Sequence, residues 1–142
     1  MNGKTLSLAL LVVALALSTS CKRSEPAAAP SATPQVSVVA VTLGRELGTD
    51  KKVLAASESF APGDTIYASV DTQGAAATAS LAARWKYQDG QTVHEESQAI
   101  APLGPATTEF HVSKPDGWPQ GSYTVEILLN GVSVRTASFR VG

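Results

Sequence analysis

The dipeptide Asn130-Gly131 constrains the fold of this chain more than any other feature of its sequence. Both central residues of a two-residue type I′ turn need a positive φ, which Gly adopts freely and Asn more readily than most residues. Before the turn, apolar side chains recur at every second position, at Tyr123, Val125, Ile127 and Leu129. This alternation is typical of a strand with one buried face, so residues 116–141 predict a β-hairpin against which the other strands pack.

The run after the turn changes the parity of its apolar positions. Val132 and Val134 continue the inward parity of the hairpin, and the later apolar positions fall on the opposite parity, at Ala137, Phe139 and Val141. One extra residue in a strand moves the side chains that follow it to the other face of the sheet. We therefore expect Val132 and Val134 to face inward and a one-residue β-bulge near residues 135–137.

Residues 1–20 are typical of an export signal. Lys4 precedes a twelve-residue run, residues 6–17, that is apolar apart from Ser7, and small polar residues follow it before Cys21. Such a run is too short to cross a hydrocarbon core of roughly 30 Å as a helix, and its flanks match those of a secretory signal peptide. Cys21 is the only cysteine, so the chain cannot form an internal disulfide.

Residues 17–21, Leu-Ser-Thr-Ser-Cys, resemble the lipobox of bacterial lipoproteins, although Ser18 stands where that family usually has an aliphatic residue. The resemblance implies that Cys21 is the lipid attachment site, carries a thioether-linked diacylglycerol and becomes the mature N-terminus. In that family the residue after the cysteine helps to sort the protein, and Lys22 implies the outer membrane rather than the inner membrane. The alternative is ordinary signal-peptidase cleavage after Ser20, which leaves Cys21 as a free thiol.

Residues 22–35 have the composition of a disordered linker. Pro26, Pro30 and Pro34 are spaced by four residues, and the segment has no large apolar side chain to bury. At about 3.1 Å per residue in a polyproline-like state, it reaches roughly 40 Å. The sequence therefore divides into a signal peptide (1–20), a lipidated cysteine with a Pro/Ala-rich linker (21–35) and one domain (36–142).

The composition of residues 36–142 predicts an all-β domain. Eight Lys or Arg stand against eleven Asp or Glu, a formal charge near −3 without a basic stripe, which argues against nucleic acid as a partner. No window shows a sustained 3.6-residue apolar stripe. Turn signals separate seven or eight short expected strands: 36–43, 53–60, 65–72, 81–87, 91–101, 108–112, 123–129 and 132–141. This pattern predicts a single antiparallel β-sandwich.

Two places in the chain resemble an immunoglobulin-like sandwich. Trp85 lies on an alternating strand in the middle of the domain, where such domains often bury a tryptophan, and Gly121-Ser122-Tyr123 resembles a tyrosine corner at the start of the penultimate strand. The cysteine pair of antibody domains is absent, so the resemblance is to disulfide-free relatives. The resemblance implies a fold and leaves the function open.

His94, Glu95 and Glu96 form the one cluster that could bind metal or transfer protons. His111 is the only other imidazole and the domain has no thiolate, so ligands for a closed transition-metal site are lacking. The polar run 91–101 suits an exposed sheet edge instead. The sequence has no Gly-x-Ser-x-Gly nucleophile and no phosphate-binding glycine loop. We therefore expect no metal, no cofactor and no catalytic residue, and a domain that is not an enzyme.

Trp118, which precedes Pro119, is the candidate ligand-binding residue. An exposed tryptophan can form an aromatic platform for a sugar or a partner chain, whereas a buried one would close one end of the sandwich.

The first hypothesis on function is a lipid-anchored envelope protein whose sandwich is a non-catalytic interaction or accessory module for an unidentified envelope protein or glycan. The second is a carbohydrate- or peptide-binding lipoprotein that uses loops near Trp118 or an open edge strand. A hydrolase, which would need converging titratable groups, is the third.

Overall fold

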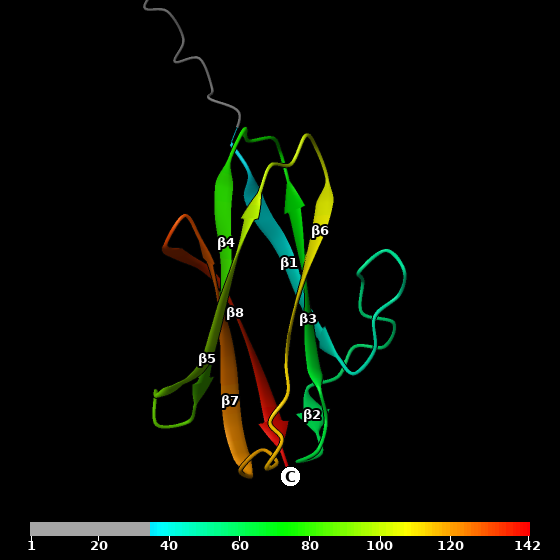
Figure 1. Ribbon diagram of the computed structural model, residues 1–142, viewed down its shortest axis with the longest axis vertical. Helices are drawn as coiled ribbons and strands as arrows, with labels where there is room; N and C mark the ends of the chain where they lie inside the picture. Colours follow the sequence, from blue (N-terminus) through cyan, green and yellow to red (C-terminus); the bar gives the residue numbers. More distant parts are fainter. Residues whose placement is uncertain (1–34) are drawn as a thin grey trace, which may run out of the picture. The chain divides into compact units, whose positions relative to one another are not determined.

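The computed structural model describes residues 35–142; the predicted signal peptide, Cys21 and all but the last residue of the predicted linker lie outside this range. The described residues form eight strands (Figure 1): β1 Ser37–Gly44, β2 Ser59–Phe60, β3 Ile66–Gln73, β4 Ala79–Tyr87, β5 Thr92–Ile100, β6 Ala106–Val112, β7 Gly121–Leu129 and β8 Val132–Val141. Residues 35–142 include no helix with the length and apolar character that crossing a bilayer requires. The predicted all-β fold is confirmed.

The strands form two sheets that enclose one core. The three-stranded sheet has the order β1-β3-β6, and the five-stranded sheet has the order β2-β8-β7-β4-β5. All neighbouring strands are antiparallel except β2 and β8, which pair in parallel over two residues. The alternation predicted for residues 65–72 is confirmed, since Ile66, Ala68 and Val70 are fully buried.

The β7–β8 hairpin forms as the sequence predicts, with φ of 51° at Asn130 and 80° at Gly131. Leu128 pairs with Ser133 and Ile127 pairs with Arg135, so Val134 is the extra residue of a β-bulge. The bulge therefore falls slightly earlier than predicted. The predicted inward orientation of Val132 and Val134 is wrong, because Val134 is itself the bulged residue and Val132 follows the exposed turn. The two valines are 64% and 39% exposed.

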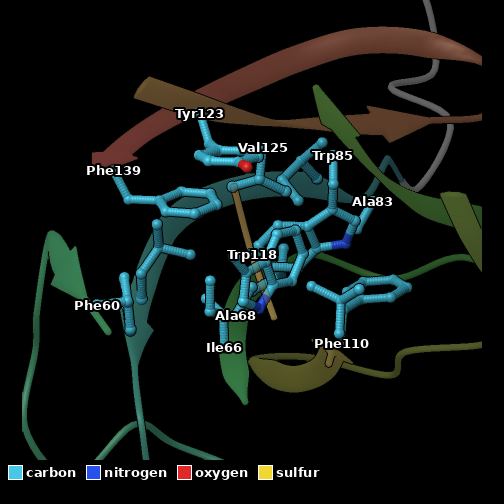
Figure 2. Packing of buried hydrophobic residues seen from close by; sticks show 14 of the residues in the cluster. Phe60, Ile66, Ala68, Ala83, Trp85, Phe110, Trp118, Tyr123, Val125 and Phe139 are labelled. Carbon is cyan, nitrogen blue, oxygen red and sulfur yellow. The ribbon is translucent and has the colours of Figure 1, made fainter. Parts of the chain in front are cut away.

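Aromatic rings pack edge to face and stacked in one half of the core (Figure 2). The ring of Phe139 lies 5.2 Å from Tyr123, 5.8 Å from Trp85 and 5.5 Å from Phe60, measured between centroids. Trp85 is fully buried, and its Nε1 has no hydrogen-bond partner among the described residues. The sequence-based placement of Trp85 in the core is confirmed.

The strand expected over residues 53–60 is shorter than predicted. Only Ser59–Phe60 is a strand, and the preceding residues form a loop tied to the sheet by isolated bridges. The loop covers the outer side of β3, where Ser69 Oγ accepts a hydrogen bond from the Val53 amide at 2.7 Å and donates one to the Lys51 carbonyl at 2.9 Å. Ser69 is therefore buried although its parity points away from the core.

The sandwich has two ends, which we name by where the described chain begins (Figure 1). The proximal end contains Gln35, the β3–β4 connection 74–78, the β5–β6 connection 101–105 and the turn Asn130-Gly131. The Ala76 amide donates to the Pro102 carbonyl at 2.9 Å, and the Ser80 amide donates to Asn130 Oδ1 at 2.9 Å, so these segments are neighbours. The distal end contains the turns 61–65 and 88–91, the β6–β7 connection 113–120 and the C-terminus.

Candidate functional site

Trp118, the candidate ligand-binding residue, lies at the distal end and is only 4% exposed. Its Nε1 donates to the Asp64 carbonyl at 3.0 Å, and its backbone amide donates to the Pro62 carbonyl at 2.7 Å. Its ring meets Tyr123 edge to face with the centroids 5.4 Å apart. The indole face is therefore packed against the protein, and the residue joins the β6–β7 connection to the turn before β3.

Tyr123 forms the tyrosine corner that the sequence resembles. Its hydroxyl donates to the Pro119 carbonyl, four residues upstream, at 2.7 Å. Burial of the phenol, with a smaller contribution from nearby Tyr87, raises the pKa of Tyr123 above its ordinary value. The neutral hydroxyl therefore persists as a donor, and the corner holds the connection that carries Trp118.

Arg45 and Asp64 form a second set of contacts at the distal end. The Asp64 carboxylate accepts the Ala61 amide at 2.8 Å and Arg45 Nε at 2.7 Å. The backbone hydrogen bond, followed by the one from Arg45, holds the pKa of Asp64 below its usual value. The Arg45 guanidinium also lies over the Phe60 ring, 5.1 Å from its centroid. The turn between β2 and β3 is thus fixed by both charge and packing.

A pocket of about 370 Å³ opens beside Trp118 and Tyr123, between the start of β5 and the end of β6. Aromatic side chains form one wall and the edge strand forms the other, and the residues that define it are Tyr87, Val93, His94, Lys114, Trp118 and Tyr123. Val93 is 46% exposed, so an apolar side chain faces solvent at the mouth. The volume is within the range of small-ligand sites. We name it the distal pocket.

The distal pocket carries one permanent positive charge, Lys114, and no carboxylate in its lining. Tyr87 supplies a hydroxyl that donates to the Gln120 carbonyl at 3.1 Å and accepts from Gln88 Nε2 at 3.1 Å. Aromatic walls with a few fixed polar groups suit the apolar faces and hydroxyls of a sugar, or an extended peptide lying along the edge strand.

The cluster at residues 94–96 is divided between the two faces of β5. His94 pairs with the buried Trp85 and lines the distal pocket, whereas Glu95 pairs with Arg84 on the outer face of the sheet. There the Arg84 Nε lies 2.7 Å from a Glu95 oxygen, and the Lys86 Nζ lies 2.7 Å from a Glu126 oxygen. No group of three or more His, Cys, Asp or Glu side chains that could hold a metal ion occurs within residues 35–142.

These ion pairs set the charge state of the outer face. The hydrogen bond from Arg84 lowers the pKa of Glu95, and the hydrogen bond from Lys86 lowers that of Glu126. The hydrogen bond to Glu95 raises the pKa of Arg84 in turn. All three groups are therefore ionised at neutral pH and pair with one another across neighbouring strands, which is a structural use of charge on a solvent-facing sheet.

A larger depression, about 510 Å³, lies where β1 faces β8. Its lining is small or aliphatic, with Val41, Ser57 and Ala137 among its residues and Glu58 as its one charged group. Next to it, Arg135 Nη2 donates to the Val39 carbonyl at 3.3 Å and bridges the two sheets. Because it lacks the aromatic anchors of the distal pocket, this depression is the weaker candidate for ligand binding.

No protein-family model matches the chain, and no curated protein matches it. Among solved structures, an immunoglobulin-like protein from Pseudomonas aeruginosa aligns with a TM-score of 0.51 at 11% identity, over 78% of this chain and 99% of that one. A β-glucosidase involved in saponin metabolism from intestinal bacteria aligns at 0.52 and 14% identity, over 77% of this chain. The alkylpurine DNA glycosylase AlkC of Pseudomonas fluorescens aligns at 0.50 and 16% identity, over 76%.

These similarities define the fold. The two sheets and eight strands form an immunoglobulin-like β-sandwich, as the sequence predicts. This chain covers only 16% of the β-glucosidase chain and 30% of the AlkC chain, less than a third of either enzyme's length. Sequence identities this low show that the folds are similar and do not show a shared activity.

The sequence identified one wall of the distal pocket and missed the other. Trp118 was the residue singled out, and the structure places beside it Tyr87 from β4, Val93 from β5 and Lys114 from its own β6–β7 connection. Tyr87 shares the parity of Trp85 at the end of its strand, so the alternation carried a signal for it. Lys114 carried none, because a lysine in a connection is usually solvated. Cys21 lies outside the described residues.

Proposed function

We propose that this protein is an envelope lipoprotein, anchored through acyl chains on Cys21 to the outer membrane, whose sandwich is a non-catalytic interaction module. The observation that carries the proposal is that the single cysteine directly follows a stretch with the sequence pattern of an export signal. Two or three acyl chains hold a protein at a bilayer durably without a transmembrane helix. The described domain begins at its proximal end, which leaves the distal pocket at the end away from the tether.

The module assignment has separate support. The same fold makes up nearly the whole of a small immunoglobulin-like protein and a small part of two larger enzymes, which is the distribution expected of a module. The four charged side chains whose pKa values are shifted in residues 35–142, Asp64, Arg84, Glu95 and Glu126, are all in ion pairs on the surface. The net negative charge of the domain favours a protein or glycan partner over nucleic acid.

The anchor is tested by replacing its attachment atom. Cys21→Ala removes the only thiol, so the protein is expected to leave the membrane fraction and appear in the soluble exported fraction, while Ser24→Ala in the adjoining linker leaves it with the membrane. Mass spectrometry of the native protein should find an acylated Cys21 as the first residue. An N-terminus beyond Cys21, or an unmodified thiol, would remove the lipid anchor from the proposal.

The distal pocket supports a second candidate function, the binding of a carbohydrate or peptide. Three aromatic residues from β4, β7 and the β6–β7 connection meet there beside the exposed Val93. Val93→Lys places a charge at the mouth without touching the core, and Val39→Lys makes the same change at a similarly exposed valine on β1, 43% exposed. Glycan-array or peptide-library binding that is lost in the first variant and kept in the second supports this function. Equal binding by both variants contradicts it.

A further inference from the structure

The connections at the proximal end carry no charged residue. The four segments that meet there are the start of the domain at 35–43, residues 72–80, residues 99–108 and residues 127–134, and none contains Lys, Arg, Asp, Glu or His. Along the chain, the charged residues directly next to them are Asp71, Glu109, Glu126 and Arg135. The domain as a whole carries nineteen charged residues among Lys, Arg, Asp and Glu, so this end is set apart from the rest.

The same end exposes apolar side chains. Leu103 is 94% exposed between Pro102 and Gly104, and Val132 is 64% exposed beside the hairpin turn. Val132 also lines a depression of about 410 Å³, together with Gln35, Val36, Ala76 and Leu129 among others, again without a charged group. A single exposed leucine is ordinary on a protein surface, so what distinguishes this end is that its exposed apolar side chains lie on connections without a charged residue.

The position of Cys21 in the chain indicates what the proximal end contacts. The described domain begins with Gln35 at this end, and the Gln35 carbonyl packs against Gly74. Fourteen residues, 22–35, separate the domain from Cys21, and even fully extended they span no more than about 50 Å. Whatever holds Cys21 therefore keeps the proximal end within that distance, which makes a contact too weak for a free protein effectively intramolecular.

We propose that the proximal end docks onto the lipid surface, with Leu103 and Val132 in the headgroup region and the distal pocket facing away from it. This inference rests on the proposed anchor at Cys21. Exposed apolar side chains gain free energy by entering the interface between headgroups and acyl chains. An anionic surface repels the net negative domain, and the proximal connections approach it without a carboxylate of their own, whereas the distal turns carry Asp64, Asp89 and Asp116.

The docking is tested on the full lipidated protein in vesicles of phosphatidylethanolamine and phosphatidylglycerol. An environment-sensitive fluorophore is placed on Leu103→Cys and, in a second protein, on Gly63→Cys in the distal turn, where a Cβ meets nothing within 4 Å. Acylation consumes the Cys21 thiol, so each protein has one reactive thiol and the parent chain takes no label. We expect a blue shift and quenching by a lipid-borne quencher at position 103 and neither at position 63.

A matched pair of variants tests the apolar contact itself. With the fluorophore on Ala77→Cys, an exposed position at the proximal end, Leu103→Asp is expected to reduce quenching several-fold. Leu54→Asp makes the same change at a leucine that is 66% exposed in the loop before β2, and it should leave quenching unchanged. Equal effects of the two substitutions would overturn the role of Leu103.

The outcomes separate the docking from the anchor. Protein that floats with vesicles but shows no quenching at position 103, or equal quenching at positions 103 and 63, overturns docking and leaves the anchor intact. Protein that does not float, or a parent chain that takes the label at Cys21, overturns the anchor and the docking with it.

Discussion

The two ends of the sandwich are built from different residues. All eight aromatic residues of the described chain lie in the distal half or at the middle of the core, and the distal turns are fixed by side-chain hydrogen bonds from Trp118, Tyr123 and Arg45. Apart from Leu103 and Asn130, the proximal connections are made of Gly, Ala, Pro and Thr, and they are joined mainly through backbone groups and Asn130. One end is held by directional side-chain contacts and the other by the backbone.

This difference indicates a division of labour. Directional contacts at the distal end fix the positions of the aromatic side chains that line the pocket, which is the condition for a specific binding site. The proximal end needs only a smooth uncharged surface if it rests on lipid, and small residues provide one. Stability and recognition therefore concentrate at the distal end, and substitutions there should cost more than substitutions at the proximal end.

The largest effect is expected for Trp85→Ala in the aromatic half of the core. Trp85 is fully buried and packs against Phe139, so its loss leaves a cavity that costs about 3–5 kcal/mol of unfolding free energy. Trp85→Phe is the control, because it keeps an aromatic ring and removes an Nε1 that has no partner in residues 35–142. Chemical denaturation measures both. A negligible loss for the alanine variant would show that the aromatic cluster does not carry the fold.

A smaller loss is expected for Tyr123→Phe, which removes the hydroxyl of the tyrosine corner. The Pro119 carbonyl then loses a donor at 2.7 Å, and because Pro119 is exposed to water the expected cost is that of a typical hydrogen bond, about 0.5–1.5 kcal/mol. Tyr87→Phe removes a hydroxyl at a more exposed position and should cost less. Denaturation midpoints compare the two. If Tyr87→Phe costs as much as Tyr123→Phe, the corner is not what fixes the distal end.

The Asp64 carboxylate makes distal stability depend on pH. Because folding lowers the pKa of Asp64, its stabilising contribution is fully present above the unfolded pKa of about 3.9 and is lost as the pH falls through the folded pKa. Asp64→Asn should therefore lower the melting temperature at pH 7, by an amount equivalent to less than about 1 kcal/mol for such a partly exposed pair. The difference from the parent protein should shrink toward pH 2.5.

The contribution of Arg45 can be separated by a double-mutant cycle. In an Arg45→Ala background the effect of Asp64→Asn at pH 7 should be smaller, because one of the two donors to the carboxylate is already gone. A pH-independent effect of Asp64→Asn in the parent chain would contradict the assignment of the acid sensitivity to this group.

How far the sequence predicts the molecule depends on whether the signal is local. Alternation and turn chemistry located the strands and the hairpin, since the φ preferences of Asn130 and Gly131 are properties of those residues. The exposure of Val134 was not predictable from parity, because Val134 is the bulged residue and the pairing with β7 decides where the bulge falls. The second wall of the distal pocket was missed for the same reason: it joins segments that only the tertiary fold brings together.

The smallest effect on stability is expected at Leu103, and this is where the comparison of the two ends is sharpest. The side chain is 94% exposed, so Leu103→Ser should change the unfolding free energy by less than about 0.5 kcal/mol, which thermal and denaturant unfolding can verify. If Leu103 has no function either, its substitution should also leave lipid contact unchanged. If Leu103→Ser leaves unfolding unchanged and still reduces lipid contact by the anchored protein, the leucine serves the surface rather than the core. If it destabilises the domain markedly, the proximal end is held by side-chain packing after all, and the contrast with the distal end fails.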